Sequence, residues 1–325
     1  MATLLNAGPG AIPVIDVRAS DPHPPQSVVD EFGSACADLG FLVIGGHGIG
    51  DDVIAPMLDA TKKFFALPPE TKERYRSPFD NQFRGFTAKS RYQDGPPDLK
   101  EGFQVSLFDT ADDMRVAGYA DEFASEFEPN IWPAEPAEFQ NAWRTYLDRV
   151  RDLSDYLMRV AALALDLPEN WFEDKFSRQS SYLLANYYPA QETAPLAGQQ
   201  RLHAHTDFGA FTILYQENDL GGLEVLRRDG SWLRVPAIPG TFIVNLGDML
   251  ANWTNDRWVA TMHRVRNTEE SEAGSERFSV PFFQHPNLDA MIETIPTCLE
   301  PGEAPKHAPI MWRDWGKHRM SEVTK

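Results

Sequence analysis

Two residues near the middle of the 325-residue chain have the types and spacing of a metal site. His205 and Asp207 lie two positions apart in the stretch Leu-His-Ala-His-Thr-Asp, residues 202–207. Because alternate residues of a strand share a face, this imidazole and this carboxylate can approach one ion. A second histidine from another element would complete a 2-His-1-carboxylate triad, which holds iron(II) and leaves coordination positions open for substrate and oxygen.

The second histidine has several candidates. His263 lies inside a β-type run, residues 261–265, and would be fixed on a rigid element. A His-x-Asp pair also arises by chance, and a lone histidine is more often an ordinary core or surface residue. The spacing alone therefore leaves the metal site as a hypothesis. The other candidates are His285, which precedes a proline, and His307 and His318, which lie in a polar tail.

A second polar pair follows on a later β-type run. Arg277 and Ser279 are two apart and share a strand face. An arginine that faces a β core is costly unless it meets an anion, and a guanidinium with a hydroxyl suits a carboxylate. The alternative is an exposed edge strand with a solvated arginine. Asn186 and Tyr188 also share a strand face, and either bind the same anion or pack within a half-buried strand.

The elements that would carry these residues divide the chain into two parts. Before about residue 180, one-faced apolar patterns predict helices over 27–39, 52–66 and 136–165, and a buried strand over 41–44. After it, short β-type runs separated by turn residues predict a β barrel or sandwich. These runs are 181–188, 202–206, 210–216, 222–227, 231–235, 241–245, 261–267 and 277–284.

Composition excludes several function classes. The formal net charge is −18 at pH 7, which argues against a nucleic-acid surface and against binding to anionic lipid. No signal peptide and no run long enough to span a membrane is visible. The two cysteines cannot form a disulfide framework, so we expect a cytoplasmic protein. The glycine-rich stretch 45–50 lacks the spacing of a nucleotide loop and is interpreted as a turn.

Taken in order, short motifs along nearly the whole chain resemble the isopenicillin-N-synthase-like family of iron(II)- and 2-oxoglutarate-dependent oxygenases. Each motif is weak alone, but their order and spacing together are specific. The motifs are Ile12-Pro13-Val14-Ile15-Asp16, Gly40-Phe41-Leu42-Val43-Ile44, His47-Gly48-Ile49, Phe64-Phe65-Ala66-Leu67-Pro68, Asn186-Tyr187-Tyr188-Pro189, His205-Thr206-Asp207, Gly221-Gly222-Leu223-Glu224-Val225, Asn245-Leu246-Gly247-Asp248, His263-Arg264-Val265 and Arg277-Phe278-Ser279-Val280-Pro281-Phe282-Phe283.

The resemblance implies an α+β fold, with a double-stranded β-helix (jelly-roll) core and flanking helices. It implies one integrated domain over 1–325, with a mostly helical part over about 1–180, a metal-binding core over 181–285 and a C-terminal extension over 286–325. The catalytic iron(II) ligands would be His205, Asp207 and His263. The residues that hold the co-substrate 2-oxoglutarate would be Arg277 and Ser279, assisted by Tyr188 and Asn186, and O2 would be the oxidant.

The resemblance predicts oxidation of a small organic substrate, a specialised metabolite, by hydroxylation, desaturation or cyclisation, with no nucleic-acid or membrane partner. Two alternatives stay open. The first is an iron(II) oxidase of the same fold that does not use 2-oxoglutarate, because relatives such as isopenicillin N synthase use the Arg-x-Ser pair to hold another anion. The second is a non-catalytic relative that only binds a metal or ligand. The candidate substrate residues are Phe283, Phe211, Tyr182, Leu184, Phe86, Arg91 and His203, the last expected at the pocket mouth.

Overall fold

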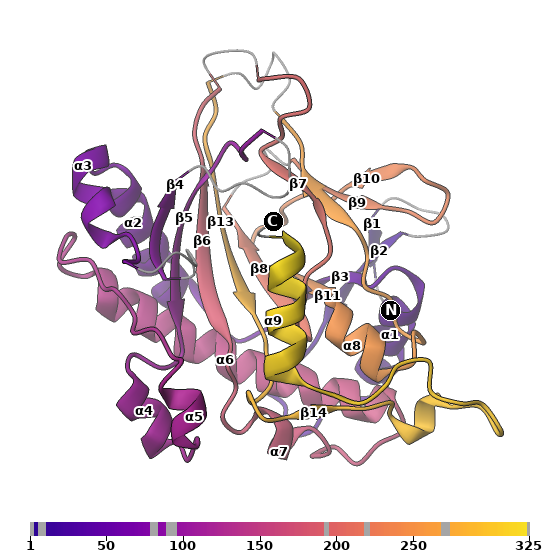
Figure 1. Cartoon of the computed structure of the whole chain (residues 1–325). Helices are drawn as coiled ribbons and strands as arrows, with labels where there is room; N and C mark the ends of the chain where they lie inside the picture. The colour runs from indigo at the N-terminus through magenta and orange to yellow at the C-terminus, as the bar shows by residue number, and fades with distance from the viewer. Residues whose placement is uncertain are drawn as a thin grey trace.

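A large β-sheet forms the centre of the computed structural model, which describes residues 3–5, 11–78, 84–88, 96–191, 195–217, 222–267 and 274–323 (Figure 1). All neighbouring strands in this sheet are antiparallel except β2 and β3. In order across the sheet, the strands are β1 (Thr3–Leu5), β2 (Ile12–Asp16), β3 (Phe41–Gly45), β11 (Phe242–Leu246), β8 (Phe211–Gln216), β13 (Arg277–Phe283), β6 (Tyr182–Tyr188), β5 (Glu101–Ser106) and β4 (Gly85–Ala88).

A smaller antiparallel sheet faces part of the large one. An apolar cluster lies between the two sheets and joins Phe41, Leu214 and Ile243 of the large sheet to Leu223 and Val225 of the small one. The two facing sheets with helices outside confirm the predicted jelly-roll core. The strands of the small sheet, in order, are β10 (Trp232–Arg234), β9 (Leu223–Leu226), β12 (His263–Val265) and β7 (Leu202–His205).

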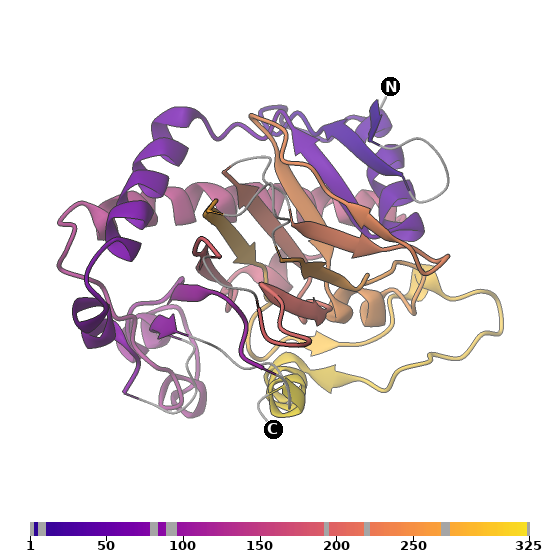
Figure 2. The ribbon, with the colours of Figure 1, turned by 90° about the horizontal axis from the view of Figure 1, so that it is seen from above.

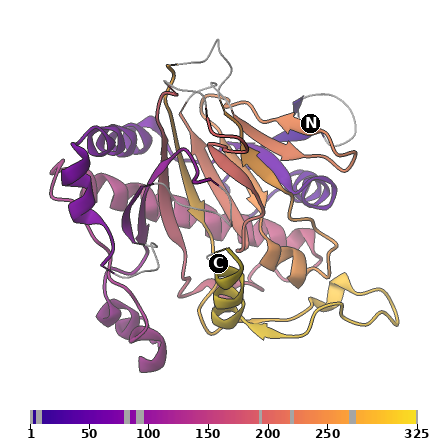
Figure 3. The same ribbon diagram turned by 45° about the horizontal axis from the view of Figure 1, so that its top comes forward.

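Helices cover the outer face of the large sheet. Figure 2 shows the long helix α6 crossing behind its strands, and Figure 3 shows the C-terminal helix α9 beside them. The helices are α1 (Gln26–Asp38), α2 (Asp51–Phe65), α3 (Pro69–Lys72), α4 (Ala111–Val116), α5 (Asp121–Ala124), α6 (Phe139–Ala164), α7 (Glu173–Phe176), α8 (Asp248–Trp253) and α9 (Trp312–Val323), with short 3-10 turns η1 (Glu73–Tyr75) and η3 (Pro296–Cys298) and a small hairpin of β14 (Met291–Ile292) and β15 (Ile310–Met311).

The N-terminal part is more than a helical wrapping. It supplies β1 to β5, which extend the large sheet at both of its edges. One junction shows how tightly these elements meet: Gly40, between α1 and β3, has φ of +65°, and a Cβ there would lie 1.9 Å from the carbonyl oxygen of Val259. Only glycine fits this position, so the Gly-Phe-Leu-Val-Ile motif marks a steric requirement.

The predicted one-faced pattern of 136–165 is confirmed in α6, which buries its apolar side against the sheet. Trp143 is fully buried, its ring stacked on Phe139 at 4.7 Å and edge-on to Phe103 at 5.4 Å. Its indole N–H donates to Thr61 Oγ1 of α2 at 3.0 Å. This tryptophan therefore links α6, α2 and the sheet edge.

Replacing this tryptophan tests the core. Trp143→Ala should lower the free energy of unfolding by about 3–5 kcal/mol, because it leaves a large cavity in the core. Chemical denaturation measures this, with Arg149→Ala on the exposed side of α6 as the control, expected to change stability by less than about 0.5 kcal/mol. A loss of less than about 1 kcal/mol for Trp143→Ala would contradict the packing.

Candidate metal centre

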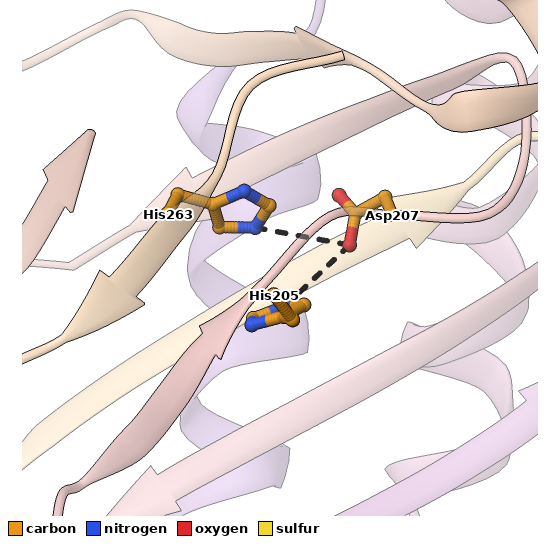
Figure 4. A group of neighbouring side chains, drawn as sticks. All are labelled: His205, Asp207 and His263. Carbon is orange, nitrogen blue, oxygen red and sulfur yellow. Dashed lines mark ion pairs between the residues drawn. The ribbon is translucent and has the colours of Figure 1, made fainter. Parts of the chain in front are cut away.

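Three side chains converge on one point (Figure 4). His205 ends β7, Asp207 lies in the loop that follows β7, and His263 begins β12. His205 Nε2 lies 3.6 Å from Asp207 Oδ1, and His263 Nε2 lies 3.8 Å from the same oxygen. The ladder between β7 and β12 pairs His205 with His263, which brings their rings to 4.3 Å. The ligand atoms of the three residues lie within 4.8 Å of one another, the only such group of potential metal ligands in the described part of the chain.

Both imidazoles are turned so that Nε2 faces this point. His205 Nδ1 lies 2.8 Å from the carbonyl oxygen of His203, and His263 Nδ1 lies 3.1 Å from that of Thr261. Since a carbonyl only accepts, each Nδ1 carries a proton, and Nε2 is the nitrogen left to bind a metal. Burial, together with the charge of His263, lowers the pKa of His205 to about 4, so its ring is neutral at pH 7.

The carboxylate of Asp207 is fixed from the large sheet. Its Oδ2 accepts from Thr212 Oγ1 of β8 at 2.5 Å and from Asn245 Nδ2 of β11 at 2.7 Å. Burial alone would raise the pKa of Asp207, but the nearby histidines and these two donors outweigh it and hold the pKa below its usual value. Asp207 is therefore an anion whose Oδ1 is left for a ligand. Two imidazole nitrogens and one carboxylate oxygen suit a divalent ion such as iron(II).

The loop that carries Asp207 is held by close backbone contacts. The Asp248 N–H donates to the carbonyl oxygen of Asp207 at 2.7 Å. A Cβ added at Gly247 would lie 2.4 Å from the carbonyl oxygen of Gly209, so no larger residue fits between α8 and the loop. The Asn-Leu-Gly-Asp motif thus serves the site twice: Asn245 binds the Asp207 side chain, and the turn after it packs against the Asp207 backbone.

Arg277 is buried on the inner face of the large sheet. Its Nη1 donates to Ser279 Oγ at 3.1 Å and its Nη2 to Gln216 Oε1 at 2.5 Å, and its guanidinium lies 4.9 Å from the Tyr188 ring centre. Within the described residues its Nε has no hydrogen-bond partner and no carboxylate pairs with it. Burial lowers its pKa. A buried guanidinium without a counter-ion marks an anion site.

The exposed-edge alternative for Arg277 is wrong. Strand β13 lies inside the large sheet between β6 and β8, and Arg277 is 1% exposed. The ladder pairs Arg277 with Tyr188, and Ser279 with Asn186, so the four residues predicted to hold 2-oxoglutarate share one face of adjacent strands. Their roles toward that ligand stay a prediction.

Some candidate substrate residues lie on this inner face. Phe283 and Tyr182 are cross-strand partners whose rings stack at 4.8 Å, and Leu184 lies on the same face of β6. His203 stands apart from the metal group, with Nδ1 hydrogen-bonded to Asp98. Arg91 lies outside the described residues.

Two candidate substrate residues face the wrong way. Phe211 precedes Thr212, which points to Asp207, so strand alternation turns Phe211 outward, where it packs edge-on against Phe32 of α1 at 5.6 Å. Phe86 is 2% exposed and packs against Phe64 of α2 at 6.2 Å. Both residues belong to the hydrophobic core under the helices, which corrects their prediction as substrate residues.

His285, a candidate distal ligand, is not part of the metal group. Its ring lies 4.6 Å from Trp312 of α9 and 5.0 Å from Tyr182. Burial lowers its pKa to about 3, against a weaker opposite effect of Asp207. The remaining candidates, His307 and His318, are likewise outside the group.

The lowered pKa of His285 predicts an acid-sensitive fold. In the unfolded chain this histidine takes up a proton below about pH 6.5, whereas in the folded chain it does so only near pH 3. The free energy of unfolding therefore falls as the pH drops from 6.5 toward 3. Both proteins are compared without bound metal. Between pH 7 and 4.5, the free energy of unfolding of His285→Gln should fall by up to about 2 kcal/mol less than that of the wild type. Denaturant titrations at several pH values measure this; identical pH slopes would contradict it.

Comparisons with known proteins agree with this geometry. Residues 179–286 match the model of the 2OG-Fe(II) oxygenase superfamily, and residues 12–135 match that of the non-haem dioxygenase in morphine synthesis N-terminal family. A homoarginine-6-hydroxylase of Oryza sativa subsp. japonica is 32% identical over 96% of both chains. Validamycin A dioxygenase of Streptomyces hygroscopicus subsp. limoneus is 30% identical over 90% of this chain and 81% of its own.

Solved structures show the same likeness. A full-length Neurospora crassa protein in complex with alpha-KG superposes with a TM-score of 0.85, at 26% identity and over 98% of both chains. The rice dioxygenase for auxin oxidation superposes with a TM-score of 0.74, at 25% identity and over 95% of both chains. The chain therefore belongs to the superfamily of 2-oxoglutarate- and iron(II)-dependent oxygenases, as its motifs indicated.

Proposed function

We propose that His205, Asp207 and His263 bind the iron(II) of this 2-oxoglutarate-dependent dioxygenase, and that the centre oxidises a small organic molecule. The observation that carries the proposal is the convergence of two Nε2 atoms on Asp207 Oδ1, at 3.6 and 3.8 Å, with each other polar atom of the triad already hydrogen-bonded. We infer a specialised metabolite as substrate, and hydroxylation, desaturation or cyclisation as the reaction.

We further propose that Arg277 and Ser279 hold the distal carboxylate of 2-oxoglutarate, with Tyr188 and Asn186 beside it. The buried guanidinium and its Nε without a hydrogen-bond partner in the described residues support this assignment. Because Arg277 and the triad lie on facing sheets, a dicarboxylate can meet the metal with one end and the guanidinium with the other. An oxidase of the same fold that does not use 2-oxoglutarate would consume oxygen without forming succinate.

Iron(II) with 2-oxoglutarate and O2 supplies the oxidation, in which 2-oxoglutarate becomes succinate and carbon dioxide and the substrate loses hydrogen or gains oxygen. The chain's own residues contribute position and charge. The backbone carbonyls of His203 and Thr261 keep both imidazoles in one tautomer, and Thr212 and Asn245 keep Asp207 ionised and aimed. Burial of these groups excludes water from the charges they hold.

We infer one integrated domain, because strands from the N-terminal part and from 181–285 share one sheet. We also infer a cytoplasmic protein, supported by Cys36 and Cys298, which are both free and buried. No helix in the described ranges is long and apolar enough to cross a bilayer. We propose a small molecule as the partner of this chain, and neither nucleic acid nor a membrane, consistent with the charge of −18.

The metal assignment predicts a graded series of variants. Asp207→Ala should abolish metal-dependent succinate formation, since it removes the one anionic ligand. Thr212→Val should keep the ligands and weaken metal affinity about 10- to 100-fold, because it removes a hydrogen bond that orients Asp207. Succinate assays with iron(II) measure the activity, and anaerobic titration with Mn2+ measures the metal affinity. Thr241→Val, whose hydroxyl donates to the carbonyl oxygen of Ile238, is the control. An active Asp207→Ala enzyme would refute the triad.

The co-substrate assignment predicts a spectroscopic difference. Anaerobic protein with iron(II) should develop a weak visible charge-transfer band on adding 2-oxoglutarate. Arg277→Gln should raise the 2-oxoglutarate concentration needed for the band about 100-fold or more, because a charge-assisted carboxylate grip is lost. Arg234→Gln, at an exposed position of β10, is the control. No band in folded, iron-loaded wild type, or oxygen consumed without succinate, would instead favour the oxidase alternative.

A further inference from the structure

A second cluster of charged residues lies beside the metal group, and none of the roles above uses it. It consists of Asp98 and Lys100, just before β5, and His203 of β7. Asp98 is 1% exposed, and its Oδ1 accepts from the His203 N–H at 3.2 Å and pairs with His203 Nδ1. Its other oxygen, Oδ2, is buried and has no hydrogen-bond donor among the described residues. This oxygen therefore lacks the donor that a buried carboxylate needs.

Lys100 supplies the complementary group. Its Nζ donates to Asn186 Oδ1 at 2.8 Å, the one hydrogen bond that the described structure gives to its three N–H donors. Burial lowers the pKa of Lys100, while the charge of Asp98 opposes the change. Asn186 is the cross-strand partner of Ser279, so Lys100 lies on the strand face that also carries Arg277 and Ser279.

The hydrogen bond of Lys100 to Asn186 places its ammonium on the inner face of the large sheet. Gly102 pairs with Asn186 across β5 and β6, and Lys100 is two residues before Gly102, so both share the face of Asn186. His203 lies at an irregularity in the pairing of β7 with β12, and its backbone N–H and its Nδ1 both meet Asp98, which ties β7 to the segment before β5. Asp98 and Lys100 attract each other without a direct ion pair. Asp98 Oδ2 is an acceptor without a donor in the described residues, and Lys100 has N–H donors beyond its bond to Asn186, which suits a ligand that carries both kinds of group.

We propose that Asp98 and Lys100, with His203 held by Asp98, form the polar anchor for the substrate, which carries a carbonyl or carboxylate acceptor next to an N–H or ammonium donor. This inference rests on the proposed function, since it names the substrate class of the same centre. Lys100 donates to the acceptor. The Asp98–His203 pair accepts from the donor. An amino-acid zwitterion and a cyclic imide both present this pattern, and the stacked Tyr182 and Phe283 offer an apolar wall for the rest of the molecule.

The test uses two probes with matched analogues. L-homoarginine represents the zwitterion, and 6-guanidinohexanoic acid is the same molecule without its α-amino group. Thymine represents the imide, and 1,3-dimethylthymine lacks its N–H donors. Calorimetric titration under nitrogen, with protein holding Mn2+ and 2-oxoglutarate, measures each Kd. We expect one parent probe to bind at least about tenfold more tightly than its analogue. Which parent does so distinguishes the amino acid from the imide.

Two variants connect this preference to the cluster. Asp98→Asn should reduce the preference for the parent probe to less than about threefold, and Lys100→Met should weaken the parent about tenfold. The matched controls are Asp112→Asn and Lys63→Met, at exposed helical positions, which should leave each Kd unchanged. Circular dichroism checks folding, and if Asp98→Asn does not fold, the analogue comparison and Lys100→Met decide.

Three results would overturn the proposal: no probe preferred over its analogue, variants that bind the preferred probe as the wild type does, or a Lys100→Met variant that loses affinity for 2-oxoglutarate alone. The last result would assign Lys100 to the co-substrate. Failure of the proposed function looks different, because wild-type protein would then show no charge-transfer band with 2-oxoglutarate. A protein that binds 2-oxoglutarate and neither parent probe contradicts only the substrate class.

Discussion

The pairing of β7 with β12 is the constraint on which the site depends. It sets His205 opposite His263 and brings their rings to 4.3 Å before any metal is present. A slip of one residue in this register would turn one imidazole to the other face of the sheet. The large sheet then completes the site from across the barrel, since Thr212 and Asn245 fix the carboxylate between the two rings. The site therefore needs both sheets, because the small sheet positions the two histidines and the large sheet holds the carboxylate.

Charge balance explains how an acidic protein can receive a dianionic co-substrate. The chain carries a net charge of −18, which opposes a small anion at long range. Inside the barrel the balance is different. Arg277 is buried without a carboxylate partner in the described residues, and Lys100 lies on the same strand face. These two cations, together with a divalent metal, provide the local positive field that the surface lacks.

Strand alternation, a local rule, predicted the His205–Asp207 pair and the Arg-x-Ser pair, whereas the resemblance to the oxygenase family was needed to choose His263 among the distal histidines. The sequence also predicted α6, whose apolar positions recur on one face. Alternation could have found Thr212 and corrected Phe211, but only after the position of Asp207 relative to β8 was known. Asp98, Lys100 and Gln216 carried no local signal. Their proximity to the site arises from contacts between segments far apart in the chain, as with His203 and Asp98, 105 residues apart.

The central claim is that His205, Asp207 and His263 hold one divalent ion. A crystal structure of the protein grown anaerobically with Mn2+ and 2-oxoglutarate, with anomalous scattering recorded for manganese, tests it most directly. The account predicts one anomalous peak at about 2 Å from His205 Nε2, Asp207 Oδ1 and His263 Nε2. A fully bound manganese ion at any other group of residues, with the triad still held by its present hydrogen bonds, would contradict it.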